Sequence, residues 1–303
     1  DSFDMSPTFK SLESLGWNLI EVNEGHNLFE LYETFKKAID LTKKQPTTPT
    51  AVVVKTIKGK GVKSTEQSSS GGHGYPLKPY DSNLENFIDE IYDGKPPMEF
   101  LTWAKEILNN KPSEEESKQD QLDTAISEKV QVGVAKALIN IKKLGLPLVS
   151  ITSDLGGSTG VAKFQKEYPD HVIDVGVAES NMVSVAAGFS KNNYIPIVDT
   201  FAQFGVTKGN LPLIMANLSN APIVAFYSHT GFQDAADGAS HQATTYFSAI
   251  CSIPNTKVFC LSHSMQAEKV VFKEISNFHR SKQEGKVPSS LIFFLGRENF
   301  PQE

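Results

Sequence analysis

The stretch Asp174-Val-Gly-Val-Ala-Glu179-Ser-Asn-Met182 is followed by a run of small residues that extends from Val183 to Gly188. It places a carboxylate, Glu179, where an apolar strand gives way to a helix rich in Ala, Val, Ser and Gly. No neighbouring basic residue neutralises this charge, and a carboxyl group in apolar surroundings can share a proton with a bound base. The alternative is a helix-start Glu that only stabilises the helix dipole. The strand–helix junction predicts an α/β fold with polar groups at the strand ends.

The region around this junction, residues 119–303, alternates between strand-like and helix-like segments. A long helix is expected from Thr124 to Leu144. Near-continuous runs of Val, Ile and Phe are typical of a mostly parallel sheet that is covered by helices on both faces. The predicted strands are Leu148–Ser153, Val172–Val175, Ile195–Thr200, Ile223–Ser228, Val258–Leu261 and Leu291–Leu295.

A partial second α/β domain is expected over residues 1–80. Asn27, with Glu30 three residues later, indicates a helix start. Ala51–Ile57 is predicted to be a buried strand that ends at Gly59-Lys-Gly61. Residues 81–118 are polar, carry two short helix-like segments and are interpreted as a linker.

Composition and charge restrict the classes of partner. The net charge of −6 is spread without a basic stripe, so nucleic acid is not expected as a partner. No apolar run approaches the roughly 18 residues that span a membrane. No secretory signal is recognised at the start. We therefore expect a cytoplasmic protein that does not associate with membranes.

Polar and aromatic side chains follow five of the predicted strands. They are Ser153–Ser158, Glu179, Phe201 with Phe204, His229 and Arg297. The carboxyl ends of parallel strands lie at one edge of a sheet, and the ligands of such sheets bind there. The pattern therefore predicts a site at this edge.

Several motifs, in this order along the chain, resemble the transketolase family. Lys55-Thr-Ile-Lys-Gly-Lys-Gly61 and His73-Gly-Tyr-Pro-Leu77 are similar to the end of the family's diphosphate-binding domain. Further motifs are similar to parts of the family's pyrimidine-binding domain. They are Asp154-Leu-Gly-Gly-Ser158, the Glu179 segment, Thr200-Phe-Ala-Gln-Phe204, Asp237-Gly-Ala-Ser-His-Gln242 and Gly296-Arg-Glu-Asn299. The resemblance implies the thiamine diphosphate-binding fold, with the diphosphate-binding part in residues 1–80 and the pyrimidine-binding domain in residues 119–303.

The resemblance implies thiamine diphosphate as the cofactor, with Glu179 and His241 as catalytic residues. In the family, a carboxylic acid at the aminopyrimidine promotes loss of the proton from the thiazolium C2 atom, and Glu179 matches that residue. His241 matches a residue that moves protons on the substrate. Phe201 and Phe204 can offer adjacent faces to the pyrimidine if their segment turns helical. His73 matches a histidine near the diphosphate.

The resemblance also implies sugar phosphates as substrates. Ser158, His229 and Arg297 match positions that contact the terminal phosphate, and Asp237 matches one that contacts a sugar hydroxyl. The implied reaction is transfer of a two-carbon ketol unit, as in the pentose phosphate pathway. The implied assembly is a homodimer with shared active sites.

Magnesium binds with thiamine diphosphate in this family, but its motif of Gly-Asp-Gly with an Asn ligand is not found among these 303 residues. We expect the Mg²⁺ ligands upstream of residue 1 and assign no metal ligand here. The chain opens at Asp1 without Met and ends soon after Arg297. It is therefore expected to be a fragment that is inactive by itself but still dimerises.

One position departs from the family pattern. A phosphate-binding Arg is usual where this chain has Glu128, which is followed by Lys129. A carboxylate repels a phosphate, so either Lys129 substitutes for the Arg or the acceptor lacks that phosphate.

Two alternative functions remain open. A deoxyxylulose phosphate synthase shares the Glu and the Gly-Ala-Ser-His type of loop, but it typically carries an Arg where this chain has Phe204-Gly-Val-Thr-Lys208. A non-catalytic paralogue or assembly subunit could have the same fold, because fold does not fix function.

Overall fold

The computed structural model describes residues 5–67, 77–111, 127–234 and 237–301. The chain forms two compact units, Asp1–Ser117 and Lys118–Glu303. His73, one of the predicted cofactor-binding residues, lies outside the described residues. Within the described parts of the chain, no helix is both long enough and apolar enough to cross a membrane.

The second unit contains a six-stranded parallel sheet with the strand order β5-β4-β6-β7-β9-β8. The strands are β4 (Leu148–Thr152), β5 (Val172–Asp174), β6 (Ile195–Phe201), β7 (Val224–Ser228), β8 (Thr256–Leu261) and β9 (Ser290–Leu295). The predicted parallel sheet is confirmed. Its central strands are fully buried, as their continuous apolar runs indicate.

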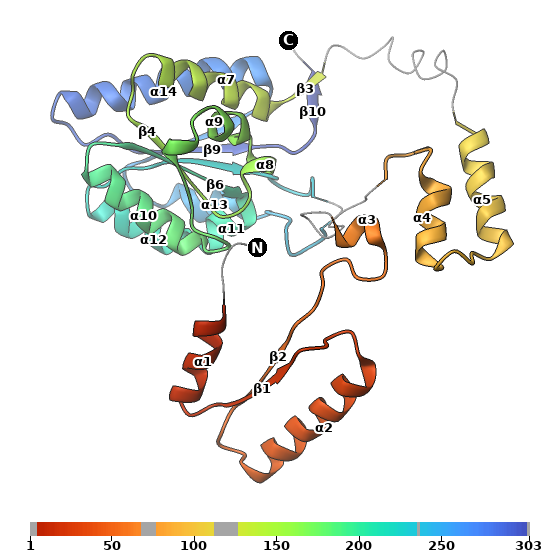
Figure 1. Ribbon diagram of the computed structural model, residues 1–303. Coiled ribbons are helices and arrows are strands. Elements are labelled where there is room, and N and C mark those ends of the chain that lie inside the picture. The colour runs from red at the N-terminus through yellow and green to blue at the C-terminus, as the bar shows by residue number, and fades with distance from the viewer. Residues whose placement is uncertain (1–4, 68–76, 112–126, 235–236, 302–303) are drawn as a thin grey trace. The chain divides into compact units, whose positions relative to one another are not determined.

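Helices cover both faces of this sheet, as predicted (Figure 1). One face carries α7 (Val130–Lys143), α9 (Ala162–Glu167) and α14 (Ser264–Gln283). The other face carries α10 (Glu179–Lys191), α11 (Ala202–Thr207), α12 (Asn210–Leu218) and α13 (Tyr246–Cys251). The unit also contains the short helix α8 (Gly156–Thr159) and the 3-10 helix η1 (Pro169–His171).

Alternate residues of each central strand enter opposite cores, because successive side chains of a strand point to opposite faces. In β7, Phe226 packs with α7 and α14, whereas Tyr227 packs with α10 to α13. β9 repeats the pattern with Phe293 and Phe294. Both faces of the sheet therefore pack against an apolar core.

The helix predicted from Thr124 begins later in the structure. A short strand, β3 (Ser127–Lys129), precedes α7 and pairs antiparallel with β10 (Asn299–Pro301). This ladder joins segments that are far apart in the sequence, and strands of three residues are too short to show a periodic pattern. The prediction of one continuous helix was therefore wrong at residues 127–129, which form β3; residues 124–126 lie outside the described residues.

The first unit has a parallel pair of strands, β1 (Asn18–Val22) and β2 (Thr50–Val54). Its helices are α1 (Ser6–Ser14), α2 (Leu28–Lys44), α3 (Lys63–Glu66), α4 (Leu84–Ile91) and α5 (Met98–Asn109). Asn27 caps α2 as predicted, because its side chain accepts hydrogen bonds from the backbone N–H groups of Phe29 and Glu30. The strand β1 was not predicted.

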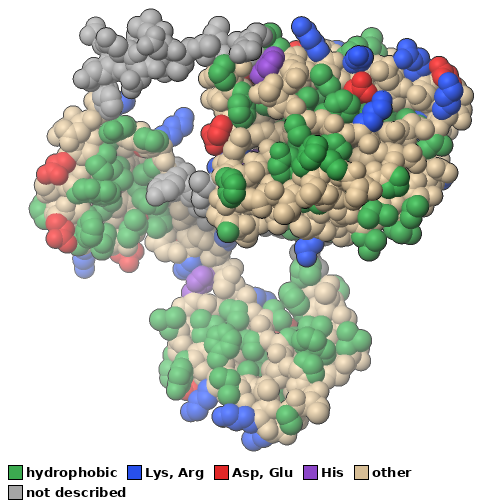
Figure 2. Space-filling view, turned by 180° about the vertical axis from the view of Figure 1, so that it is seen from behind, with side chains coloured by type: hydrophobic (Ala, Val, Ile, Leu, Met, Phe, Trp, Pro, Cys, Tyr) green, Lys and Arg blue, Asp and Glu red, His purple; other side chains and the backbone are tan. Residues whose placement is uncertain are grey.

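This first unit exposes apolar side chains (Figure 2). Large exposed residues of α2 include Leu28, Phe29, Tyr32, Phe35 and Ile39. A sheet of two strands is marginal by itself, and its described core is small. The second unit has two extensive apolar cores and therefore provides a more rigid scaffold for a site than the first unit does.

Candidate active site at the edge of the parallel sheet

The predicted site residues of the second unit follow the carboxyl ends of neighbouring strands. Glu179 follows β5, Ser158 follows β4, Phe201 ends β6, His229 follows β7 and Arg297 follows β9. Strands of a sheet are about 4.8 Å apart, so Glu179 and Phe201, two strands apart, belong to strands separated by roughly 10 Å. The sequence-predicted edge therefore exists, with Glu179 and Arg297 on opposite flanks.

Glu179 is the first residue of α10 and is only 8% exposed. Its side chain makes no hydrogen bond or ion pair with another described residue. The neighbouring Ser180 donates a hydrogen bond of 2.6 Å to the carbonyl of Lys208, which fixes the start of the helix. The backbone that carries Glu179 is thus held in place, and the carboxylate oxygens, without a described partner, remain available to a ligand.

Four rings pack together at the ends of β6 and β7. The rings of Phe201 and Phe204 are stacked, with centroids 6.1 Å apart and planes 18° apart. The ring of Phe201 also packs on that of His229, with centroids 4.0 Å apart, and the rings of Phe204 and His241 are nearly perpendicular, with centroids 5.0 Å apart. Phe201 is buried and supports the group, whereas Phe204 and His241 are half-buried and accessible to a ligand.

The position of Phe204 depends on close packing beneath α11. A Cβ atom added to Gly205 would lie 2.6 Å from the ring of Tyr227, which is fully buried. The absence of a side chain at Gly205 therefore lets α11 lie directly on β7.

Gly205→Ala is expected to lower the free energy of unfolding of the second unit by about 1–3 kcal/mol, because the extra methyl group overpacks a buried ring. Urea unfolding followed by far-UV circular dichroism measures this change. Gly157→Ala is the matched control, since an added Cβ there meets no atom within 4 Å. Equal stabilities of the two variants would contradict the close contact.

His229 has an unusual backbone at the end of β7. Its φ angle is 59°, in the left-handed region, which is uncommon for residues other than glycine and is often found at functional sites. Its Nδ1 atom shares a hydrogen bond of 2.8 Å with the Ser228 hydroxyl. The side chain is thereby directed into the ring cluster.

Charged groups surround His229, but burial has the largest effect on it. Burial lowers the pKa of His229, so the ring is neutral at pH 7. Arg297 and Lys129 lower this pKa further, whereas Asp234 and Asp237 oppose the change. Two cations and two anions therefore act on the same ring.

Arg297 is held by a residue that was not predicted. Its guanidinium forms an ion pair with Asp234, whose side chain is fully buried. Its backbone N–H donates a hydrogen bond of 2.6 Å to the side-chain oxygen of Gln233. Removing one partner of a buried ion pair typically costs about 3–5 kcal/mol, so this pair fixes the guanidinium. In the sequence, the only signal for this ion pair was the position of Asp234 in the loop after His229.

The remaining predicted substrate residues are more exposed. Ser158 lies on α8, which packs against β6 and β7, and no hydrogen bond joins its side chain to His229 or Arg297. Asp237 is exposed, and its charge acts on His229. The structure therefore groups His229, Arg297 and Asp237, whereas Ser158 lies nearby without a described contact.

The two residues at the unusual family position lie in β3. Glu128 accepts a hydrogen bond from the hydroxyl of Ser264 at the start of α14. Lys129 is the residue whose charge acts on His229. The charge of Lys129 therefore contributes to the electrostatics around His229.

A second unpredicted carboxyl group lies below the edge, in β6. Asp199 is fully buried, and its Oδ2 atom accepts hydrogen bonds from Thr159 at 2.6 Å and Thr152 at 3.1 Å. Burial raises the pKa of Asp199 to about 7. Its contact with Thr159 ties α8 to the sheet. The signal in the sequence was an Asp within an Ile and Val strand.

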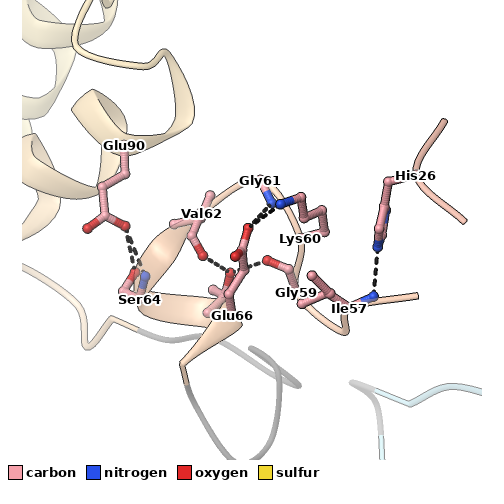
Figure 3. Close-up of polar contacts among 10 residues, drawn as sticks. His26, Ile57, Gly59, Lys60, Gly61, Val62, Ser64, Glu66 and Glu90 are labelled. Atoms are coloured by element: carbon pink, nitrogen blue, oxygen red, sulfur yellow. Dashed lines mark hydrogen bonds and ion pairs between the residues drawn. The ribbon is translucent and has the colours of Figure 1, made fainter. Parts of the chain in front are cut away.

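In the first unit, hydrogen bonds shape the loop after β2 (Figure 3). The backbone N–H of Ile57 donates to His26 Nε2 at 2.7 Å, and that of Gly61 donates to Glu66 at 2.9 Å. The hydrogen bond from Gly61 and the charge of Lys60 lower the pKa of Glu66. These contacts lie in the predicted Lys55–Gly61 segment.

Part of a thiamine diphosphate site fits the residues present. The unpaired carboxylate of Glu179 and the accessible ring of Phe204 suit the hydrogen-bonding edge and the flat face of a pyrimidine. No group of three or more His, Cys, Asp or Glu side chains within the described ranges could hold a metal ion. The described residues therefore suit the pyrimidine, and they supply no cluster for the Mg²⁺ ion.

Comparisons with known proteins agree with both units. Residues 129–283 match the family described as transketolase, pyrimidine binding domain, and residues 3–131 match transketolase, thiamine diphosphate binding domain. A Mus musculus transketolase is 33% identical over 306 residues, which is 96% of this chain and 46% of that protein. The Homo sapiens transketolase is 32% identical over 273 residues, which is 86% of this chain and 41% of that protein.

Among solved structures, transketolase from Campylobacter jejuni aligns with 99% of this chain and 49% of its own, at 18% identity and a TM-score of 0.49. The chain spans less than half the length of the mouse and human relatives. The two matched domains nevertheless follow one another over nearly all of its residues. The chain therefore belongs to the transketolase family.

Proposed function

We propose that the protein containing this chain transfers a two-carbon ketol unit between sugars with thiamine diphosphate. The observation that carries this proposal is Glu179, a nearly buried carboxylate without a described partner at the start of α10. A group of this kind is suited to hold a proton at a ring nitrogen of a bound base. The ring cluster of Phe204 and His241, at the same sheet edge, supports the proposal.

Each residue has a specific role in this proposal. Thiamine diphosphate, when bound, supplies a nucleophilic ring carbon that the protein's own side chains lack. Glu179 holds the proton at the pyrimidine edge, and Phe204 contacts the pyrimidine face, supported by Phe201. His241 moves a proton at a substrate hydroxyl, and Asp237 accepts a hydrogen bond from another hydroxyl.

Further parts of the site are proposed from the family. The Mg²⁺ ligands and most diphosphate contacts lie outside the described residues, and His73 is placed near the diphosphate. The assembly is a homodimer in which two subunits share each active site. Phosphorylated sugars are the family expectation for the substrate.

The test uses a complemented preparation, meaning this polypeptide with the remaining diphosphate-binding part, either in one longer chain or as a separately expressed domain. Supplied with thiamine diphosphate, Mg²⁺ and a ketose donor, it is expected to release an aldose shortened by two carbons. This chain alone serves as the negative control and is expected to show no transfer. Transfer from pyruvate instead of a ketose would indicate deoxyxylulose phosphate synthesis. Tight cofactor binding without turnover of either donor would indicate a non-catalytic paralogue.

A further inference from the structure

We propose that the substrate arm beside His229 ends in a neutral hydroxyl group, because Asp234 already occupies Arg297 as an internal counter-ion. This inference rests on the proposed function and narrows its substrate class to sugars without a phosphate at that end. Asp234 is then the residue that determines this specificity.

The first reason is that Arg297 cannot leave Asp234 without a large penalty. The Asp234 side chain is fully buried, Oδ1 meets the guanidinium, and Oδ2 has no hydrogen-bond partner among the described residues. Departure of Arg297 to a phosphate would leave a buried charge unpaired, which strongly destabilises a protein.

The second reason is that the backbone beside the pair has little room to shift. Gln233 accepts the N–H of Arg297, and a Cβ atom added to Gly296 would lie 2.7 Å from the same Gln233 oxygen. It would also lie 2.6 Å from the ring of Phe300. Arg297 is therefore held at its guanidinium by Asp234 and at its backbone N–H by Gln233.

The third reason is that the charges near His229 already cancel. Arg297 and Lys129 contribute two positive charges, and Asp234 and Asp237 contribute two negative charges. A phosphate ester carries a charge of about −1.5 to −2 at pH 7, and these four groups together offer it no net positive charge. The Arg297 side chain is 33% exposed, so its remaining N–H groups can donate to a hydroxyl oxygen without any charge requirement.

The competing interpretation is that Asp234 orients Arg297 toward a phosphate. The two interpretations predict opposite effects of Asp234→Asn, which keeps the shape of the side chain and removes its charge. A counter-ion releases Arg297 when it is neutralised, so phosphate binding becomes tighter. An orienting residue loses its hold on Arg297, so phosphate binding becomes weaker.

The experiment titrates this chain with inorganic phosphate and follows binding by phosphorus NMR and calorimetry. The wild type is expected to bind phosphate with a dissociation constant above about 10 mM, and Asp234→Asn at least tenfold more tightly. The double variant D234N/R297A should lose this gain. Asp170→Asn, which removes an exposed charge on η1, should leave binding unchanged.

Two phosphate-binding results would each overturn the inference. One is weaker phosphate binding by Asp234→Asn. The other is submillimolar phosphate binding by the wild type that is lost in Arg297→Ala, and this second result decides the matter even if Asp234→Asn fails to fold. Neither measurement needs cofactor or turnover. Absence of ketol transfer would therefore reject only the proposed function. Transfer with a KM at least tenfold lower for xylulose 5-phosphate than for xylulose would reject only this inference.

Discussion

Glu179→Gln is expected to slow exchange of the C2 proton of bound thiamine diphosphate by about 10²–10⁴-fold, the usual contribution of a positioned acid or base. Gln retains the shape of the side chain but cannot exchange a proton with the pyrimidine. Glu179 is nearly buried, and no other described residue contacts its carboxylate to take over this role.

The measurement is quenched deuterium exchange, followed by proton NMR of the cofactor in the complemented preparation. Glu167→Gln is the matched control, since Glu167 is an exposed residue of α9 that pairs with Lys143. Cofactor binding by Glu179→Gln is checked separately by circular dichroism, so that lost affinity is not mistaken for lost proton transfer. Unchanged exchange in a variant that still binds cofactor would remove Glu179 from the chemistry.

The sheet could be predicted from the sequence because its signal is local and repeated. A strand such as Ile195–Phe201 or Ser290–Leu295 is apolar on both faces, and this is visible within a few residues. The carboxyl ends of parallel strands must lie together, so the edge that carries Glu179 and His229 followed directly.

The interactions that could not be predicted join residues far apart in the sequence. Asp234 pairs with Arg297 across 63 positions, and Asp199 accepts from Thr159 across 40. Neither contact is signalled by spacing or periodicity, because each depends on how separate segments of the chain meet in three dimensions. Such contacts set the charge of the site, so the sequence indicated the location of the chemistry better than its specificity.

The free energy of unfolding of the wild type is expected to fall as the pH rises, whereas that of Asp199→Asn should not. Burial raises the pKa of Asp199 from 3.8 to about 7, so the native state holds this proton more tightly than the unfolded state does. The associated stability is therefore fully present below about pH 4 and is lost as the pH rises through about 7. At 1.36 kcal/mol per pKa unit, the loss has an upper bound of about 4 kcal/mol.

Hydrogen exchange of the β6 and β7 amides, corrected for intrinsic rates, is the suitable measurement. Both tryptophans, Trp17 and Trp103, belong to the first unit, so their fluorescence does not report on this core. The opening free energy of the wild type should fall as the pH rises from 5 to about 7 and then level off, whereas that of Asp199→Asn should remain level throughout. Asp170→Asn, at an exposed position, should follow the wild type.

Ionisation of Asp199 should also affect the candidate active site, because α8 connects the two. Ionised Asp199 would hold two hydroxyl groups but leave Oδ1, which has no hydrogen-bond partner among the described residues, as a buried anionic atom. The structure can relieve this by admitting water near Thr159, which loosens the helix that carries Ser158. Amides of α8 should therefore exchange faster above pH 7 in the wild type but not in Asp199→Asn. A wild type whose β6 and α8 amides show no such pH dependence would contradict a native pKa near 7 for Asp199.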